Sequence, residues 1–271
     1  MYPYNIIGDF DLYTVLILIG AVGCLLLVRF LCDRTSLSDG LTNLTLASGI
    51  VGMAVGYGGA VLFQAFYNFL ETGEFVLGSG ATFYGGLIGG AAGFLLCYFL
   101  GGHLFVRAEN PPAHFFSVAA LAACGITFAH GFGRLGCLMV GCCYGHPTDA
   151  WYGVYMVNLG YRVIPTQLIE AVFLFALTAL LVFMVLRGKR AVFATYLGAY
   201  GVFRFLLEFL RGDPRGESPL ALFSPSQLTA LLMIFAAAAL YLAETYLLEK
   251  NRQNAAPTDE EKEEKEKGDI L

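Results

Sequence analysis

The chain has 271 residues, of which 57% are hydrophobic and 14% are charged, and its mean hydropathy is +0.66. Soluble domains carry about 25% charged residues, so this composition excludes an ordinary water-soluble protein and favours one bundle of membrane helices. The net charge is −5, and residues 249–271 supply −3 of it with eight acids and five bases. The remainder is nearly neutral, which argues against nucleic acid as a partner.

Seven apolar segments are each close to the roughly 20 residues that a helix needs to cross a bilayer. They are residues 12–31, 46–67, 83–100, 113–132, 165–186, 191–210 and 226–248. The sequence therefore predicts an all-α, polytopic membrane bundle of about seven helices. We expect a transmembrane domain over residues 1–250, followed by a charged cytoplasmic tail, disordered, over residues 251–271.

Lysine and arginine residues are divided unequally between the two sides of such a bundle. Apart from three lysines in the tail, eight fall on the side of the C-terminus and five on the opposite side. Cytoplasmic loops carry the excess of positive charge, so we expect the N-terminus outside and the C-terminus in the cytoplasm.

The end of the fourth segment, residues 130–149, combines Arg134 with five glycines and a proline. We expect irregular backbone from here on, with His130 at the end of the helix. Irregular backbone at membrane depth occurs only where it is buried in protein or lines a wet cavity. This segment is therefore a candidate site on the outer side.

A second charged group lies in the sixth segment, where Arg204, Glu208 and Arg211 have the spacing of one helix face. A charge within an apolar helix costs about 2.5 to 3.5 kcal/mol, so such groups usually face a partner or a pathway. Arg204 and Glu208 could simply neutralise each other. Together with Arg134, however, Arg204 favours an anion site, because two guanidinium groups suit a phosphate.

Five short motifs, in this order along the chain, resemble those of the bacterial prolipoprotein diacylglyceryl transferases. They are Phe83-Tyr-Gly-Gly-Leu-Ile-Gly89, Gly133-Arg-Leu-Gly136 with Gly145-His-Pro-Thr148, Pro165-Thr-Gln-Leu-Ile-Glu170, Arg204-Phe-Leu-Leu-Glu-Phe-Leu-Arg211 and Ser224-Pro-Ser-Gln-Leu228. The resemblance runs from the first apolar segment to the last. It implies a multi-pass enzyme of the bacterial plasma (inner) membrane.

The resemblance also implies a reaction. Such enzymes transfer the diacylglyceryl group of phosphatidylglycerol to the lipobox cysteine thiol of a prolipoprotein, which forms a thioether and releases glycerol phosphate, without a cofactor or metal. The expected partners are phosphatidylglycerol, other membrane lipids and prolipoprotein signal peptides. The candidate catalytic residues are Arg134, Arg204, Tyr84, Glu208 and His146. The candidate phosphatidylglycerol-binding residues are Arg134, Arg204, Gly85, Gly86, Gly145, Cys137 and Arg211.

Three positions depart from the family pattern, which usually has His, Asn and Glu where this chain has Tyr84, Cys137 and Cys142. A phenol with a pKa near 10 is a poor base at neutral pH, so we expect Tyr84 to donate a hydrogen bond to a phosphate or ester oxygen. His146 and His130 have a more suitable pKa for accepting the thiol proton. Either the same reaction runs with altered proton-transfer groups, or the acceptor is different.

Cys137, Cys142 and Cys143, with His146 nearby, form a cluster in the sequence on the outer side. The pattern C-x4-C-C-x2-H is not a standard zinc spacing, so no metal site is predicted. Small-residue packing, a disulfide and a thiol-redox role stay open. A transporter of an anionic solute is a further alternative, although the Arg134 segment has no internal repeat of the kind that transporters often show.

The charge asymmetry gives a first testable prediction. A reporter fused after Leu271 is expected in the cytoplasm, and one inserted near Gly73 is expected outside, because the eight-to-five excess of basic residues fixes the orientation. Protease protection of both fusions in intact cells measures this. A C-terminal tail that is cleaved on intact cells would contradict the orientation.

Overall fold

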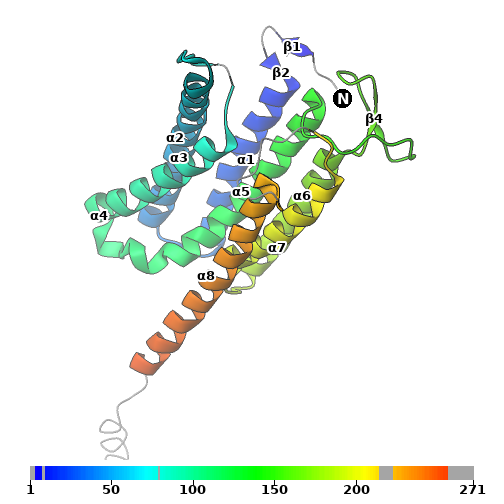
Figure 1. Cartoon of the computed structure of the whole chain (residues 1–271). Helices are drawn as coiled ribbons and strands as arrows, with labels where there is room; N and C mark the ends of the chain where they lie inside the picture. Colours follow the sequence, from blue (N-terminus) through cyan, green and yellow to red (C-terminus); the bar gives the residue numbers. More distant parts are fainter. Residues whose placement is uncertain (1–3, 8–9, 79, 214–221, 256–271) are drawn as a thin grey trace, which may run out of the picture.

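A computed structural model describes residues 4–7, 10–78, 80–213 and 222–255. Helices make up nearly all of it (Figure 1). The α-helices are α1 (Leu12–Arg34), α2 (Asp39–Thr72), α3 (Phe83–Leu96), α4 (Gly102–Phe105), α5 (Pro111–Val140), α6 (Thr166–Leu186), α7 (Val192–Leu207) and α8 (Pro225–Ala255). Short π- or 3-10 turns lie at Cys97–Gly101, Arg107–Glu109 and Glu208–Leu210. The strands are β1 (Asn5–Ile7), β2 (Phe10–Asp11), β3 (Val154–Met156) and β4 (Tyr161–Val163).

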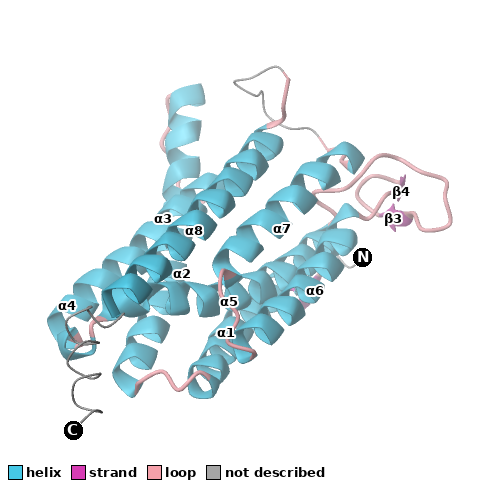
Figure 2. Cartoon of the chain, turned by 90° about the horizontal axis from the view of Figure 1, so that it is seen from below, coloured by secondary structure: helices cyan, strands magenta, loops and turns pink. Residues whose placement is uncertain are grey.

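The prediction of an all-α bundle with seven spans is confirmed. Among the described residues, seven helices are long and apolar enough to cross a membrane, with α3, the π-turn and α4 forming one continuous span. The strands form two antiparallel pairs, β1–β2 and β3–β4, and Figure 2 shows β3 and β4 outside the bundle. In Figure 1, β1 and the C-terminal end of α8 lie at opposite ends of the molecule. Residues 256–271 of the expected tail lie outside the described residues.

The helices pack as two groups. In one, α1 packs on α5, α5 on α6, α6 on α7 and α7 on α8. Its core is built from apolar side chains of α1, α5, α6 and α7, among them Leu31, Leu121, Leu174 and Tyr200. The other group is the pair α2 and α3, which stands beside the first group in Figure 1.

Helix α5 corrects the expectation of irregular backbone after His130. It continues through Gly131, Gly133 and Gly136 and ends only at Gly141, whose φ of 79° is the left-handed cap conformation. The reason is that backbone groups at membrane depth find their hydrogen-bond partners most readily within a helix. His130 is therefore inside the helix rather than at its end, and Arg134 lies one turn before Cys137 on the same helix.

Arg211 also differs from the sequence expectation. Helix α7 ends at Leu207, a single 3-10 turn follows, and Arg211 has extended backbone with a ψ of 139°. The prediction that Arg204, Glu208 and Arg211 share one helix face is therefore wrong for Arg211. The change of backbone conformation turns Arg211 toward the loop that follows α5, where Gly145 pairs with it in an antiparallel bridge.

Helices α2 and α3 approach each other closely along a row of glycines. A Cβ atom added to Gly59 would lie 2.7 Å from the carbonyl oxygen of Gly85, and one added to Gly85 would lie 2.5 Å from the carbonyl oxygen of Gly59. Small residues permit such contact between membrane helices, which gain van der Waals packing from it. Gly85 therefore holds α3 against α2.

This contact predicts different effects for two neighbouring glycines on α2. Gly59→Ala is expected to lower the free energy of unfolding by about 1–3 kcal/mol, because the added methyl group forces the helices apart. Gly58→Ala is the matched control, since a Cβ there meets nothing within 4 Å and improves helix propensity by up to about 1 kcal/mol. Unfolding of purified protein in mild detergent measures both. Equal effects of the two substitutions would contradict the close packing.

Candidate active site

A buried ion pair joins α5 to α6. Nε of Arg134 lies 3.1 Å from Oε2 of Glu170, whose side chain is fully buried. The other carboxylate oxygen, Oε1, accepts a hydrogen bond of 2.7 Å from the hydroxyl of Tyr200 on α7. One carboxylate thus connects three helices and supplies the negative charge that a buried guanidinium needs.

His130 completes this network. Its Nε2 accepts a hydrogen bond of 3.2 Å from Nε of Arg134, and its ring packs edge-on against that of Tyr200, with 5.2 Å between the ring centroids. An arginine N–H can only donate, so this contact requires neutral His130 with an unprotonated Nε2. The lone pair that a base would use is therefore already occupied by Arg134.

Arg204 lies one turn after Tyr200 on α7 and is also buried. Its Nη2 donates to the hydroxyl of Ser226 at 2.9 Å and lies 3.0 Å from Oε2 of Glu208. The Ser224 hydroxyl donates to Oε1 of Glu208 at 2.9 Å. The first turn of α8 and the end of α7 thus fix one edge of the guanidinium.

The other terminal nitrogen of Arg204, Nη1, is buried and makes no hydrogen bond with any described residue. A buried N–H without an acceptor is costly, so this group indicates a ligand that carries acceptor oxygens. Arg204 shares α7 with Tyr200, whose hydroxyl binds the Glu170 carboxylate that pairs with Arg134, so Glu170 connects the helices that carry the two arginines. That the two arginines bind one phosphate stays a prediction.

The loop after α5 is held by backbone hydrogen bonds to two distant segments. Gly145 N donates to Ile164 O at 2.9 Å and His146 N to Leu210 O at 3.0 Å, while Gly212 N donates to Tyr144 O at 3.1 Å. A Cβ at Gly145 would lie 2.7 Å from the carbonyl oxygens of both Ile164 and Leu210. Gly145 is thus required by close backbone approach, and the loop has a fixed shape.

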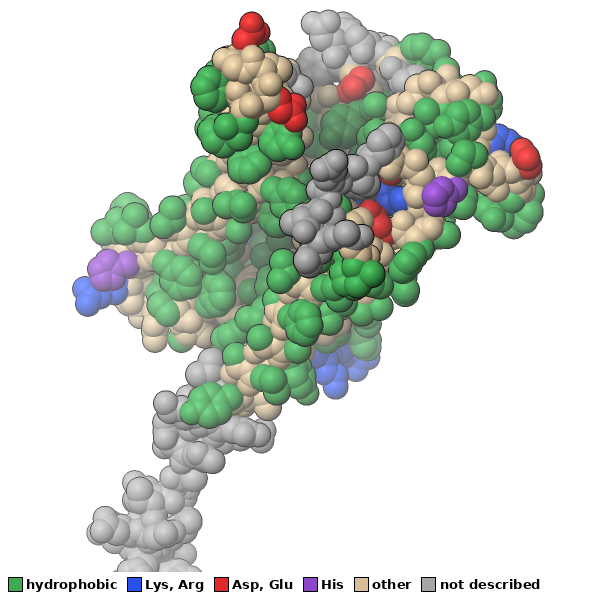
Figure 3. Space-filling view, in the orientation of Figure 1, with side chains coloured by type: hydrophobic (Ala, Val, Ile, Leu, Met, Phe, Trp, Pro, Cys, Tyr) green, Lys and Arg blue, Asp and Glu red, His purple; other side chains and the backbone are tan. Residues whose placement is uncertain are grey.

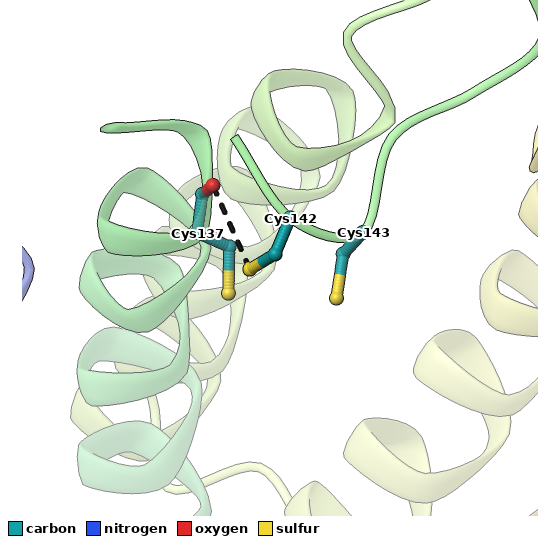
Figure 4. A group of neighbouring side chains, drawn as sticks. All are labelled: Cys137, Cys142 and Cys143. Carbon is teal, nitrogen blue, oxygen red and sulfur yellow. Dashed lines mark hydrogen bonds between the residues drawn. The ribbon is translucent and has the colours of Figure 1, made fainter. Parts of the chain in front are cut away.

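The structure brings Cys137, Cys142 and Cys143 together (Figure 4). Their Sγ atoms all lie within 4.8 Å of one another, although Cys137 is on α5 and the other two are on the loop. Arg211 forms a bidentate pair with Asp213 at 2.9 and 2.8 Å and also reaches the Cys143 thiol. The Cys137 and Cys142 thiols, together with Arg211, hold the pKa of the Cys143 thiol below its usual value.

The other predicted site residues lie around these groups. The Tyr84 hydroxyl, on the first turn of α3, is 3.1 Å from Thr229 Oγ1 and 3.4 Å from Pro225 O on α8, next to the turn that holds Arg204. A Cβ at Gly86 would make only an ordinary contact with α2. His146 is exposed on the loop. In Figure 3, hydrophobic side chains cover most of this face and charged side chains are few.

Sequence reasoning missed two members of the site. Tyr200 lies within an apolar segment of the sequence, and Glu170 is not among the predicted site residues. The available signal was the depth of Glu170 in an apolar helix, because a buried carboxylate needs a cation or several donors. The spacing of residues in the sequence does not indicate which arginine pairs with Glu170.

Comparison with known proteins decides the family. A sequence model described as prolipoprotein diacylglyceryl transferase matches residues 5–243. The chain belongs to the prolipoprotein diacylglyceryl transferase family. It is 32% identical over 205 residues to the phosphatidylglycerol–prolipoprotein diacylglyceryl transferase of Clostridium tetani, which covers 72% of this chain and 77% of that protein. It is 31% identical over 241 residues to the enzyme of that name from Aliivibrio salmonicida, covering 82% and 79%.

In this diacylglyceryl transferase family member, the Glu170 network gives a stability prediction. Glu170→Gln is expected to lower the free energy of unfolding by about 3–5 kcal/mol, because the buried Arg134 loses its counter-charge. Tyr200→Phe removes one hydrogen bond to a charged group, at a cost of about 1.5–3 kcal/mol. Unfolding in detergent measures both.

Asp33→Asn is the matched control for this comparison, because it also breaks an arginine–carboxylate pair. Its side chain pairs with Arg29 at 2.7 Å, but both groups are half-exposed. Such a pair contributes about 0–1 kcal/mol. If Glu170→Gln were as mild as Asp33→Asn, the network would not be what holds α5 and α6 together.

Proposed function

We propose that this chain transfers the diacylglyceryl group of phosphatidylglycerol to the lipobox cysteine of bacterial prolipoproteins, in the plasma membrane. The observation that carries the proposal is Nη1 of Arg204, which is buried and has no hydrogen-bond partner among the described residues, on a helix joined to the Arg134–Glu170 pair through Tyr200. It supplies a donor for an anionic headgroup at membrane depth. Family membership and the names of the relatives supply the reaction and both substrates.

The reaction forms one bond and breaks one bond. The acceptor sulfur attacks the terminal glyceryl carbon that carries the phosphate, the C–O bond to the phosphate breaks, and glycerol phosphate leaves with the electron pair. The thiol proton goes to a base or to water. The protein therefore has to hold a phosphodiester, stabilise the charge that grows on its oxygens and help the thiol ionise.

Arg134 and Arg204 are assigned to the phosphate. Each is held on one edge by a carboxylate, Glu170 for Arg134 and Glu208 for Arg204, so each is oriented before the lipid binds. Such preorganisation costs nothing at the moment of reaction, and it is worth most where water is excluded. Glu208 thus acts by positioning Arg204.

The remaining candidates surround the headgroup. We assign Tyr84 as a donor to a phosphate or ester oxygen and His146 as the acceptor of the thiol proton, since His130 already accepts from Arg134. Gly145 holds the loop in shape, Gly85 and Gly86 bring α3 close to α2, and Cys137 and Arg211 flank the headgroup. No described residue is needed to hold an organic cofactor in this scheme.

Conservative replacement of the two arginines tests the assignment. Arg134→Lys and Arg204→Lys keep the positive charge but lose the planar fork, so each is expected to lower transfer at least about tenfold, or about 1.4 kcal/mol of transition-state stabilisation. Formation of a thioether-linked lipid on a lipobox peptide, with labelled phosphatidylglycerol, measures the rate.

Arg29→Lys is the control, because Arg29 pairs with Asp33 at a half-exposed position on α1, and it is expected to leave transfer unchanged. Near-normal turnover in both site variants would leave the two arginines with only a structural role. A wild-type protein that forms no thioether with either substrate would overturn the proposed function itself.

A further inference from the structure

The thiols of Cys137, Cys142 and Cys143 lie close together next to the proposed site. Among the described residues, no other group of three Cys, His, Asp or Glu side chains is close enough to share a metal ion. Zinc prefers four ligands in a tetrahedron, with Zn–S bonds of about 2.3 Å, which places the sulfurs about 3.8 Å apart. The Sγ atoms already lie within 4.8 Å of one another. The widest pair therefore has to close by no more than about 1 Å.

Buried side chains of α6 fix the backbone that carries two of these thiols. The hydroxyl of Thr166 donates to the carbonyl oxygen of Cys143 at 2.8 Å, and Nε2 of Gln167 donates to that of Cys142 at 2.5 Å. Cys142 N donates to Cys137 O at 3.1 Å, which closes the loop onto the end of α5. Thr166 and Gln167 are almost fully buried, so the thiols are held in place rather than gathered by chance.

A disulfide accounts for this arrangement less well than a metal ion does. Neighbouring Cα atoms are 3.8 Å apart, which is shorter than the usual 4.4–6.8 Å of a disulfide, so a Cys142–Cys143 bond would be strained. A bond from Cys137 to either neighbour would leave the third thiol unused. All three cysteines are free in the structure.

The surroundings suit a charged metal–thiolate group with one open position. A divalent ion with three thiolates carries a net charge of −1. Arg211 lies beside Cys143 and Arg134 lies one turn before Cys137 on α5, and each guanidinium is also paired with a carboxylate, Asp213 or Glu170. Cys142 is exposed, which leaves the cluster open to a fourth ligand from the outside. Three protein ligands with an open fourth position are the pattern of catalytic zinc sites.

We propose that Cys137, Cys142 and Cys143 bind one thiophilic divalent d10 ion, such as Zn²⁺, and that the acceptor thiol binds it as the fourth ligand. This proposal rests on the proposed function, because it concerns how that reaction activates its nucleophile. A coordinated thiol is deprotonated, and metal coordination is an established way to activate a nucleophile.

Binding to the ion releases the acceptor thiol proton to His146, the proton acceptor assigned above, and the bound thiolate sulfur then attacks the glyceryl carbon. The C–O bond to the phosphate breaks, glycerol phosphate leaves with the electron pair beside Arg134 and Arg204, and the thioether product leaves the ion. The ion is neither oxidised nor reduced, and the three cysteines stay thiolates throughout.

Metal binding is tested on the purified full-length protein, prepared without oxygen in detergent. We expect about one zinc per chain by elemental analysis, and loss of most of it in Cys142→Ser and in Cys143→Ser. Cys97→Ser is the control, because this partly buried cysteine lies in α3's π-turn, and it should keep the metal. A protein that retains no metal and takes up neither Zn²⁺ nor Co²⁺, or that carries a Cys137 disulfide, would overturn the site.

Cobalt substitution tests the open position without relying on turnover. A lipobox peptide is expected to intensify the sulfur-to-cobalt charge-transfer absorption, and the same peptide with serine in place of its cysteine is not. Chelation of the wild-type protein should lower transfer at least about tenfold, and Zn²⁺ should restore it. Unchanged absorption with the cysteine peptide, or full turnover after chelation, would overturn the role in activation.

The two proposals fail in different ways. A wild-type protein that binds the metal and shows the cysteine-dependent absorption, yet forms no thioether from phosphatidylglycerol, contradicts the diacylglyceryl reaction and supports the metal and thiol site. A protein that forms the thioether at full rate without metal contradicts the role of the metal in thiol activation and supports the reaction.

Discussion

The buried pair between Arg134 and Glu170 ties the scaffold to the chemistry. Removing two charges from water is expensive, and a buried ion pair often contributes little net stability compared with apolar packing. Here Glu170 pairs with Arg134 and accepts a hydrogen bond from the Tyr200 hydroxyl, so α5, α6 and α7 meet at one charged point inside an apolar bundle. The clearest consequence of this ion pair is that it fixes the orientation of the Arg134 guanidinium at membrane depth.

Both arginines follow the same plan, in which a carboxylate holds one edge and leaves donors for a ligand. Glu170 lies across the interface from Arg134, whereas Glu208 is one turn after Arg204 on the same chain segment. The Arg204 pair is further held by Ser224 and Ser226 at the start of α8. The last helix therefore contributes to the site although much of its surface faces outward.

The thiol cluster depends on a different constraint, the need of membrane-embedded backbone to stay hydrogen-bonded. Helix α5 keeps its hydrogen bonds through three glycines and carries Cys137 to its last turn. The loop then returns, held by Thr166 and Gln167, so that Cys142 and Cys143 face Cys137. Cys137 and Cys142 occupy positions where the family pattern has Asn and Glu. A change in how this chain activates the acceptor thiol would therefore be located at this cysteine cluster.

The sequence by itself determined the membrane class, the seven spans, the family and the two arginine motifs, because hydropathy and short ordered motifs are local properties of the chain. It misjudged the end of α5, because glycines that break helices in soluble proteins are tolerated in a membrane helix. It also misjudged the direction of Arg211, because α7 ends at Leu207 and Arg211 follows a 3-10 turn with extended backbone. Only the tertiary structure decided that Glu170 meets Arg134, that Tyr200 joins them and that Thr166 and Gln167 of α6 hold the loop with Cys142 and Cys143. These contacts join different helices and loops. They depend on how the helices cross in space, which the spacing of residues along the chain does not reveal.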